Sequence, residues 1–302
     1  MYYFNCTSIK LQETILDLMK RINFKWQNLI ECPECNKSDF IFEKNYFHCN
    51  ECKKTLNINK NKTYIFEKVY EPKDKSINPY IFSNKKSKKL KNWRELNYLE
   101  IEKWIKKSKN SELILDLGCG PLTNFNLLKK YKTLYVDGAE FESIDLVCNF
   151  EKRIAFKSCS FDKILLSNVL EHIYNPLNIF REVKRLLKPN GECLILVPFL
   201  IKLHQEPYDF NRYTKHFLRR ICENNGLEIL KIENIGSPLN ILENISKIHL
   251  SKTSKKDLKD LFLYQLRIFK LLLNRIDGFI SRDEKALESI PQGYMLLLKK
   301  NN

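Results

Sequence analysis

From Leu113 onward the apolar residues fall into short runs that end at turn residues. The runs are LILDLG, TLYVDG, FDKILLSN and ECLILVP, with GLEILKIENIG and GYMLLLKK nearer the carboxyl end. Helical patterns such as NFNLLKKY and PLNIFREVKRLLK separate the first four. Short strands that alternate with helices predict βαβ units and a mostly parallel sheet. We therefore expect a doubly wound α/β domain, with the last two runs completing a seven-stranded sheet.

The residues before this domain follow other patterns. Apolar positions at helical spacing predict a helix in SIKLQETILDLMK, whereas FIFEKNYFHC and TYIFEKVY suit β-hairpins. A stretch rich in Pro, Asn, Ser and Lys predicts a linker, and WRELNYLEIEKWIKK, which begins at Trp93, predicts an amphipathic helix. The expected organisation is a helical segment at 1–26, a small module at 27–70, linker and helix at 71–110, and the α/β domain at 111–302 with a helical insertion at 238–290.

Composition narrows the class of protein. Of the 302 residues 43% are hydrophobic and 29% are charged, which is ordinary for a soluble globular protein. No stretch of eighteen apolar residues and no signal-peptide pattern is present, so we expect a cytoplasmic protein. The formal net charge of +16 suits RNA, an anionic membrane or phosphorylated substrates, although coding bias toward lysine explains it equally well.

Two cysteine pairs predict a metal site. Cys32 and Cys35 form one Cys-x-x-Cys pair, and after thirteen residues Cys49 and Cys52 form the second. Four thiolates on two tight turns give a closed tetrahedral site, which suits structural zinc and leaves no position for catalytic water. The other six cysteines are scattered and are expected to be reduced thiols.

A glycine turn follows the first strand of the α/β domain. In LILDLGCGP the strand carries Asp116 and runs into Gly118 and Gly120, and Asp137 ends the next strand, twenty-one residues after Asp116. Glycines allow a ligand close to the backbone, and an acid at that distance suits a ribose. A dinucleotide fingerprint would place a third glycine where this chain has Thr123, which disfavours NAD.

These motifs, together with SFDKILLSNVLEHI and FREVKRLLKPNGECLILVPF, resemble class I S-adenosylmethionine-dependent methyltransferases, of the type 11-like group, over residues 111–236. The resemblance implies a Rossmann-like fold and S-adenosylmethionine as cofactor. It places Asp116, Gly118 and Gly120 at the methionine part and Asp137 at the ribose. It also places Asn149 at the adenine, where many relatives have Asp, and Ser167 and Asn168 facing the cofactor. For Glu171 and His172, which open the next helix, helix capping and a functional role are equally weighted.

A polar and aromatic loop, HQEPYDFNRYT at 204–214, follows the fifth predicted strand. Ligands bind at this edge of parallel sheets, so the loop predicts a substrate site. His204, and after it Asp209, are candidate catalytic bases, and Tyr208, Arg212 and Tyr213 are candidate substrate contacts. The alternative is a structural loop in which Asp209 pairs with Arg212. The segment resembles the loop of a methyltransferase subgroup linked to cell-surface glycan or nucleotide-sugar pathways.

The cysteine-containing module resembles the small zinc-ribbon activators of tRNA and protein methyltransferases. Three functions follow: a methyltransferase for a small molecule or glycan precursor, an RNA or protein methyltransferase that docks through the ribbon, or a non-catalytic cofactor-binding module. The intact Asp116-x-Gly-x-Gly and Asp137 argue against the last of these functions.

Residues 256–280 have a broad apolar face that is interrupted by basic residues. This pattern predicts a helix that packs on the domain or on a second copy of the chain, with peripheral membrane contact as the alternative.

Overall fold

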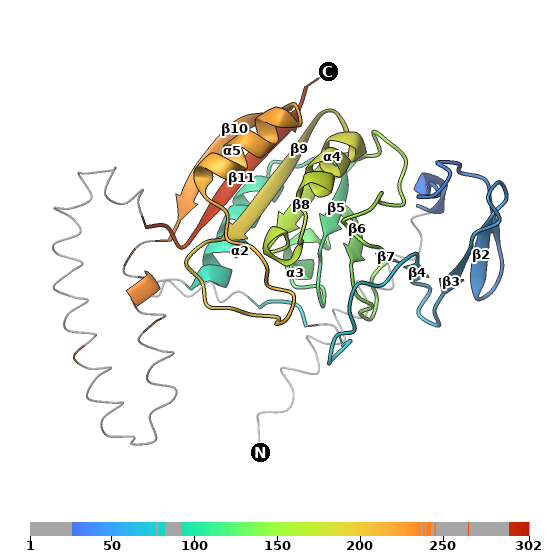
Figure 1. Ribbon diagram of the computed structural model, residues 1–302, viewed down its shortest axis with the longest axis horizontal. Coiled ribbons are helices and arrows are strands. Elements are labelled where there is room, and N and C mark those ends of the chain that lie inside the picture. Colours follow the sequence, from blue (N-terminus) through green and yellow to red (C-terminus); the bar gives the residue numbers. More distant parts are fainter. Residues whose placement is uncertain are drawn as a thin grey trace, which may run out of the picture.

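A computed structural model describes residues 26–76, 78–81, 92–236 and 290–301, with a few isolated positions between 238 and 265 (Figure 1). The predicted helix at 8–20, the lysine run of the linker and the helix at 256–280 lie outside these residues. Among the described helices, none is both long and apolar enough to cross a bilayer.

One mixed sheet runs through the described part of the molecule, in the order β1-β2-β3-β4-β7-β6-β5-β8-β9-β11-β10. The α/β domain supplies seven of these strands. They are β5 (Leu113–Leu117), β6 (Lys132–Asp137), β7 (Leu146–Val147), β8 (Phe161–Ser167), β9 (Leu187–Pro198), β10 (Leu227–Ile235) and β11 (Gly293–Lys300). Pairing is parallel from β7 to β9, whereas β11 is antiparallel to both β9 and β10. The predicted doubly wound, mostly parallel seven-stranded sheet is confirmed.

Helices cover both faces of this sheet. On one face α4 (Leu177–Leu186) and α5 (Lys215–Asn224) belong to the same hydrophobic cluster as Leu115 and Leu117 of β5. On the other, α2 (Trp93–Ile105) and the short α3 (Phe125–Leu128) pack against Ile114 of the same strand. Because every residue of β5 is buried, its sequence is a continuous apolar run interrupted only by Asp116.

The cysteine-containing module extends the sheet. Its strands β1 (Phe40–Phe42), β2 (Tyr46–Cys49), β3 (Thr55–Ile58) and β4 (Tyr64–Ile65) form an antiparallel ribbon. β4 then pairs in parallel with β7, so that Tyr64 lies opposite Leu146 (Figure 1). Trp26 packs edge-on to Tyr64 and Phe156, with ring centroids 5.0 and 6.2 Å away. The ribbon thus shares its core with the α/β domain.

Candidate functional site

The turn after β5 brings the backbone close to the segment that follows β8. Gly118 has φ +86°, and a Cβ atom placed there would lie 2.3 Å from Cγ2 of Val169. Gly120 also has positive φ, +54°, but a Cβ there would meet open space apart from Thr123. Gly118 is therefore required by a close approach as well as by its backbone conformation, whereas Gly120 is required by conformation alone.

Asp137, the last residue of β6, is buried and holds this turn. Its carboxylate accepts hydrogen bonds from the backbone N–H of Gly120 at 2.8 Å and of Ala139 at 3.0 Å. The hydroxyl of Tyr70 donates to the same group at 3.2 Å. Burial raises the pKa of Asp137, and the hydrogen bonds oppose that effect because they favour the charged form.

Asp116 lies beneath the turn and is completely buried. Neither oxygen of its carboxylate makes a hydrogen bond of good geometry among the described residues. Burial raises the pKa of Asp116 to about 7, although the nearby Asn124 side chain lowers it. A buried polar group without a partner is costly, so this position suits a ligand that supplies a donor.

A cavity of about 610 Å³ opens over this turn, at the carboxyl ends of the parallel strands. The loop after β9 contributes Gln205, Glu206 and Tyr208, and the segment after β4 contributes residues 69–73. Four carboxylates line the cavity against one lysine; the lining charges are Glu71, Asp137, Glu151, Glu206 and Lys73. The cavity therefore has an acidic lining in a chain whose net charge is +16.

Of the predicted cofactor residues, Gly118, Gly120, Asp137, Asn149 and Asn168 line the cavity. Asp116 and Ser167 do not; Asp116 lies under the turn, and Ser167 accepts a hydrogen bond from Asn168 at 3.3 Å. The Asn168 amide oxygen accepts from Trp93 Nε1 at 2.6 Å, and the Asn149 amide donates to Glu67 at 3.1 Å.

Some residues of the loop at 204–214 line the cavity, whereas others only hold the loop in its conformation. Tyr208 lines the cavity, whereas Arg212 and Tyr213 do not. Arg212 donates to Asp209 at 2.8 Å, and the Tyr213 hydroxyl donates to the backbone oxygen of Leu170 at 3.1 Å.

The surroundings of Asp209 do not suit a general base. Its side chain is only 2% exposed. Burial by itself raises the pKa of Asp209, but hydrogen bonds from Arg212 and the His204 N–H bring it to about 2. A carboxylate held so strongly in its charged form is a poor proton acceptor at neutral pH. The structural alternative, an Asp209–Arg212 pair, is the one that the geometry favours.

His204 lies beside Glu171 and His172, which are the last two residues of the short helix η3 (Leu170–His172) and do not open it. His204 Nε2 is 3.5 Å and His172 Nε2 is 3.7 Å from the same oxygen of Glu171. The Glu171 carboxylate raises the pKa of His204, and Asp209 adds to this effect. The sequence did not predict that these three residues meet, because thirty-one positions separate His172 from His204.

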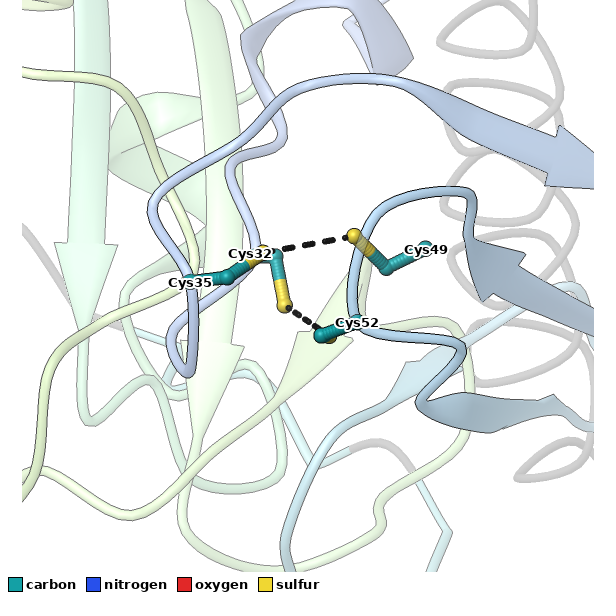
Figure 2. Close-up of side chains that lie close together, drawn as sticks. All are labelled: Cys32, Cys35, Cys49 and Cys52. Atoms are coloured by element: carbon teal, nitrogen blue, oxygen red, sulfur yellow. Dashed lines mark hydrogen bonds between the residues drawn. The ribbon is translucent and has the colours of Figure 1, made fainter.

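The four cysteines of the ribbon lie together, and Figure 2 shows their sulfur atoms pointing toward one another. Sγ of Cys32 is 3.6 Å from Cys52, and Sγ of Cys35 is 3.4 Å from Cys49. Sulfurs around a tetrahedral zinc ion, with Zn–S bonds of about 2.3 Å, are about 3.8 Å apart.

The two cysteine turns share one backbone pattern. The N–H of Asn36 donates to Cys32 and the N–H of Lys53 to Cys49, each at 2.9 Å, and both donor residues have φ +59°. Two matching turns therefore present the four thiols to one point.

Comparison with known proteins is consistent with this arrangement. A family model described as a methyltransferase domain matches residues 90–232. An uncharacterized protein of Methanocaldococcus jannaschii is 32% identical over 172 residues, which cover 52% of this chain and 74% of that protein. The chain belongs to the class I S-adenosylmethionine-dependent methyltransferases. A second uncharacterized protein of that organism is 29% identical to the methyltransferase over 36% of this chain and 57% of its own length.

Solved structures similar to the methyltransferase include the [4+2]-cyclase SpnF, with 14% identity and a TM-score of 0.47 over 72% of this chain and 85% of the cyclase. Another is an O-methyltransferase from a trans-AT PKS multienzyme of Brevibacillus brevis in complex with S-adenosyl-L-homocysteine. It has 18% identity and a TM-score of 0.44 over 68% of this chain and 72% of that one.

One part of the methyltransferase site lies outside the predicted motifs. Residues 69–73, at the carboxyl end of the ribbon, form a wall of the cavity, and Tyr70 contacts Asp137 directly. No local pattern in EKVYEPK marks this segment as a ligand contact; it follows from the pairing of β4 with β7.

Proposed function

We propose that the methyltransferase binds S-adenosylmethionine in the cavity above Gly118 and transfers its methyl group to a small molecule or glycan precursor. The observation that carries the proposal is one cavity in which the glycine turn, Asp137 and Tyr208 face a common space. The cofactor supplies a methyl group already activated on a sulfonium, so the residues of the chain mainly position the two reactants.

Each end of the cofactor has a matching group. Asp137 offers a carboxylate at the position that suits ribose hydroxyls, and it keeps the Gly120 N–H aligned. The methionine part with its ammonium group would lie over the turn, and the buried Asp116 directly beneath has unfilled acceptor capacity. A cationic donor there would lower the pKa of Asp116 and keep it charged.

The charges of the cavity support the class of acceptor. Lining carboxylates outnumber lysines four to one, which suits a cationic sulfonium cofactor and an acceptor that is neutral or cationic where it enters. A polyanion such as RNA would be repelled at this opening, whatever the net charge of the whole chain. The volume of about 610 Å³ lies within the range of small-molecule sites.

The ribbon is proposed to hold one structural zinc ion through Cys32, Cys35, Cys49 and Cys52. The closely spaced sulfurs and the paired turns support this assignment. Four thiolate ligands fill the coordination of the ion, so it would stabilise the fold and take no part in methyl transfer.

Methyl-labelled S-adenosylmethionine tests the acceptor. The purified enzyme is incubated separately with a glycan-precursor and nucleotide-sugar pool, with total RNA and with a protein extract. We expect label in the first fraction. Label in RNA, with binding that weakens steeply as salt rises, would contradict the small-molecule acceptor. Failure to bind the cofactor in calorimetry would contradict the whole proposal, and Asp137→Asn serves as the low-activity control.

A further inference from the structure

A second cluster of metal-ligating side chains lies at the wall of the cavity. Glu171, His172 and His204 each offer one ligand atom, and these atoms all lie within 4.8 Å of one another. His172 also lines the cavity. The two imidazole rings are edge-on, with centroids 4.8 Å apart. None of these residues belongs to the zinc ribbon.

Hydrogen bonds orient both imidazoles toward the centre of the cluster. Nδ1 of His172 is 2.8 Å from the backbone oxygen of Tyr208. Nδ1 of His204 is 3.3 Å from the backbone oxygen of Lys202 and 3.3 Å from Oδ2 of Asp209. A carbonyl oxygen only accepts, so each Nδ1 carries a proton, and Nε2 is the nitrogen that each ring turns toward Glu171. Metal-binding histidines are typically held in this way by a partner of their other ring nitrogen.

The carboxylate between the rings makes no hydrogen bond of standard geometry among the described residues. Glu171 is 0% exposed, and neither of its carboxylate oxygens makes a hydrogen bond among the described residues. The distances to the two Nε2 atoms, 3.5 and 3.7 Å, exceed the usual 2.7–3.2 Å of an N–H···O bond. A buried carboxyl group whose contacts are all this long is costly unless an ion or a ligand between the three side chains satisfies it.

We propose that Glu171, His172 and His204 bind one divalent metal ion, separate from the zinc of the ribbon. Nitrogen and oxygen atoms that share an ion at bonds of about 2.1 Å lie about 3.0–3.4 Å apart, so the two imidazoles would move closer to Glu171 and to each other when the ion binds. Two imidazoles and a carboxylate suit Mn²⁺, Fe²⁺, Co²⁺ or Zn²⁺ better than Ca²⁺ or Mg²⁺, which prefer oxygen alone. Three protein ligands leave positions open.

The open positions give the ion a role in the reaction, and this role rests on the proposed methyltransferase function. Because His172 lines the cavity, an acceptor hydroxyl can reach the ion. The ion lowers the pKa of that hydroxyl, which releases its proton to water. The oxygen then forms a bond to the methyl carbon while the carbon–sulfur bond breaks, and the electron pair of that bond stays on sulfur. The site therefore favours an oxygen acceptor.

Cobalt titration tests the site on the full chain with zinc in the ribbon and without cofactor or acceptor. Zinc binds thiolates more tightly than cobalt does, so Co²⁺ should leave the ribbon unchanged and give no thiolate charge-transfer absorption. We expect one Co²⁺ to bind, with visible d–d bands. Glu171→Gln and His204→Ala should each weaken binding by about 100-fold or more, because loss of outer-shell partners alone costs 10–100-fold. His216→Ala, an exposed histidine of α5, is the control.

The experiment distinguishes failure of the metal site from failure of the proposed methyltransferase function. No cobalt binding to the wild-type chain, or equal binding by wild type and Glu171→Gln, would overturn the metal site. Circular dichroism of each variant verifies folding, and Glu171→Gln keeps the size of the buried side chain. Cobalt binding by a chain that fails to bind S-adenosylmethionine would leave the metal site standing and overturn the methyltransferase role.

Discussion

At the scale of single residues, Asp137 joins structure and ligand binding. It accepts hydrogen bonds from two backbone N–H groups and from Tyr70, and its carboxylate also faces the cavity. The residue both shapes the glycine turn and is the expected ribose contact. Its substitution should therefore affect cofactor affinity more than substitution of an acid elsewhere in the sheet.

We expect Asp137→Asn to weaken S-adenosylmethionine binding by about tenfold to hundredfold, since charge-assisted hydrogen bonds contribute about 1.5–3 kcal/mol. Calorimetric titration measures the dissociation constant. Asp162→Asn is the matched control, because Asp162 accepts from the Leu113 N–H at 2.8 Å at the opposite end of β5. Equal affinities for wild type and Asp137→Asn would remove Asp137 from the site.

The two turn glycines should differ in their tolerance of alanine. Gly120→Ala should cost about 1–2 kcal/mol, the penalty of left-handed backbone. Gly118→Ala should cost about 1–3 kcal/mol more, because its Cβ would overlap Val169. Urea unfolding measures both free energies. The double variant Gly118→Ala/Val169→Ala should remove the extra cost beyond that of Val169→Ala alone, and failure to do so would contradict the steric explanation.

Asp209 should make stability depend on acid pH. Its folded-state pKa, about 2, lies below the ordinary value near 3.9, so its pair with Arg212 stabilises the fold above pH 4. That contribution is lost as pH falls from about 4 to 2. Asp209→Asn should be less stable than wild type at pH 7 by about 2 kcal/mol, and the difference should shrink toward pH 2. A difference that stays constant with pH would contradict this account.

At the scale of helices and strands, much of the fold is readable in the sequence. The runs that became β5, β8 and β9 are buried on both faces, so each is continuously apolar and ends at turn residues. The pairing of β4 with β7 was not predictable, because each strand has two residues and leaves no periodic signal. The contact of Tyr70 with Asp137 depends on that pairing, so the sequence did not predict it either. The contact of Glu171 with His204 forms only when the loop after β9 folds back, which no local pattern indicates.

The ribbon as an element should depend on its metal. Cys32→Ser/Cys35→Ser should remove the ribbon zinc, about one equivalent per chain by elemental analysis, and lower the melting temperature. The control is Cys159→Ser, which changes an exposed cysteine outside the ribbon. Full zinc content in the double variant would contradict the four-thiolate site. Zinc also held at Glu171 and the two histidines would add a second equivalent that this variant retains.

At the scale of the whole molecule, the ribbon supplies a wall of the cavity. The backbone N–H of Phe66 donates to Val147 at 2.9 Å and that of Val69 to Gly138 at 2.7 Å, so the segment after β4 lies along the strand ends beside Asp137. Removal of zinc from the ribbon should therefore weaken S-adenosylmethionine binding even though none of the four ribbon cysteines lines the cavity.

Cofactor affinity of chelator-treated protein tests this coupling. We expect a loss of about 5- to 150-fold, the usual range for coupled sites. Tyr70→Phe, which keeps the ribbon but removes the hydroxyl on Asp137, should lose less. Unchanged affinity after verified loss of zinc would show that residues 69–73 hold their place without the metal.

The parallel pairing of β4 with β7 has a consequence for self-association. β7 would be the outermost strand of the seven-stranded sheet if the ribbon were absent, and its free N–H and C=O groups would be open to strands of other molecules. The ribbon replaces that boundary with β1, a strand of three residues at the end of an antiparallel hairpin. If zinc holds the ribbon in place, zinc-depleted protein should form aggregates that start from the exposed edge of β7, and the metal would preserve solubility as well as the binding site.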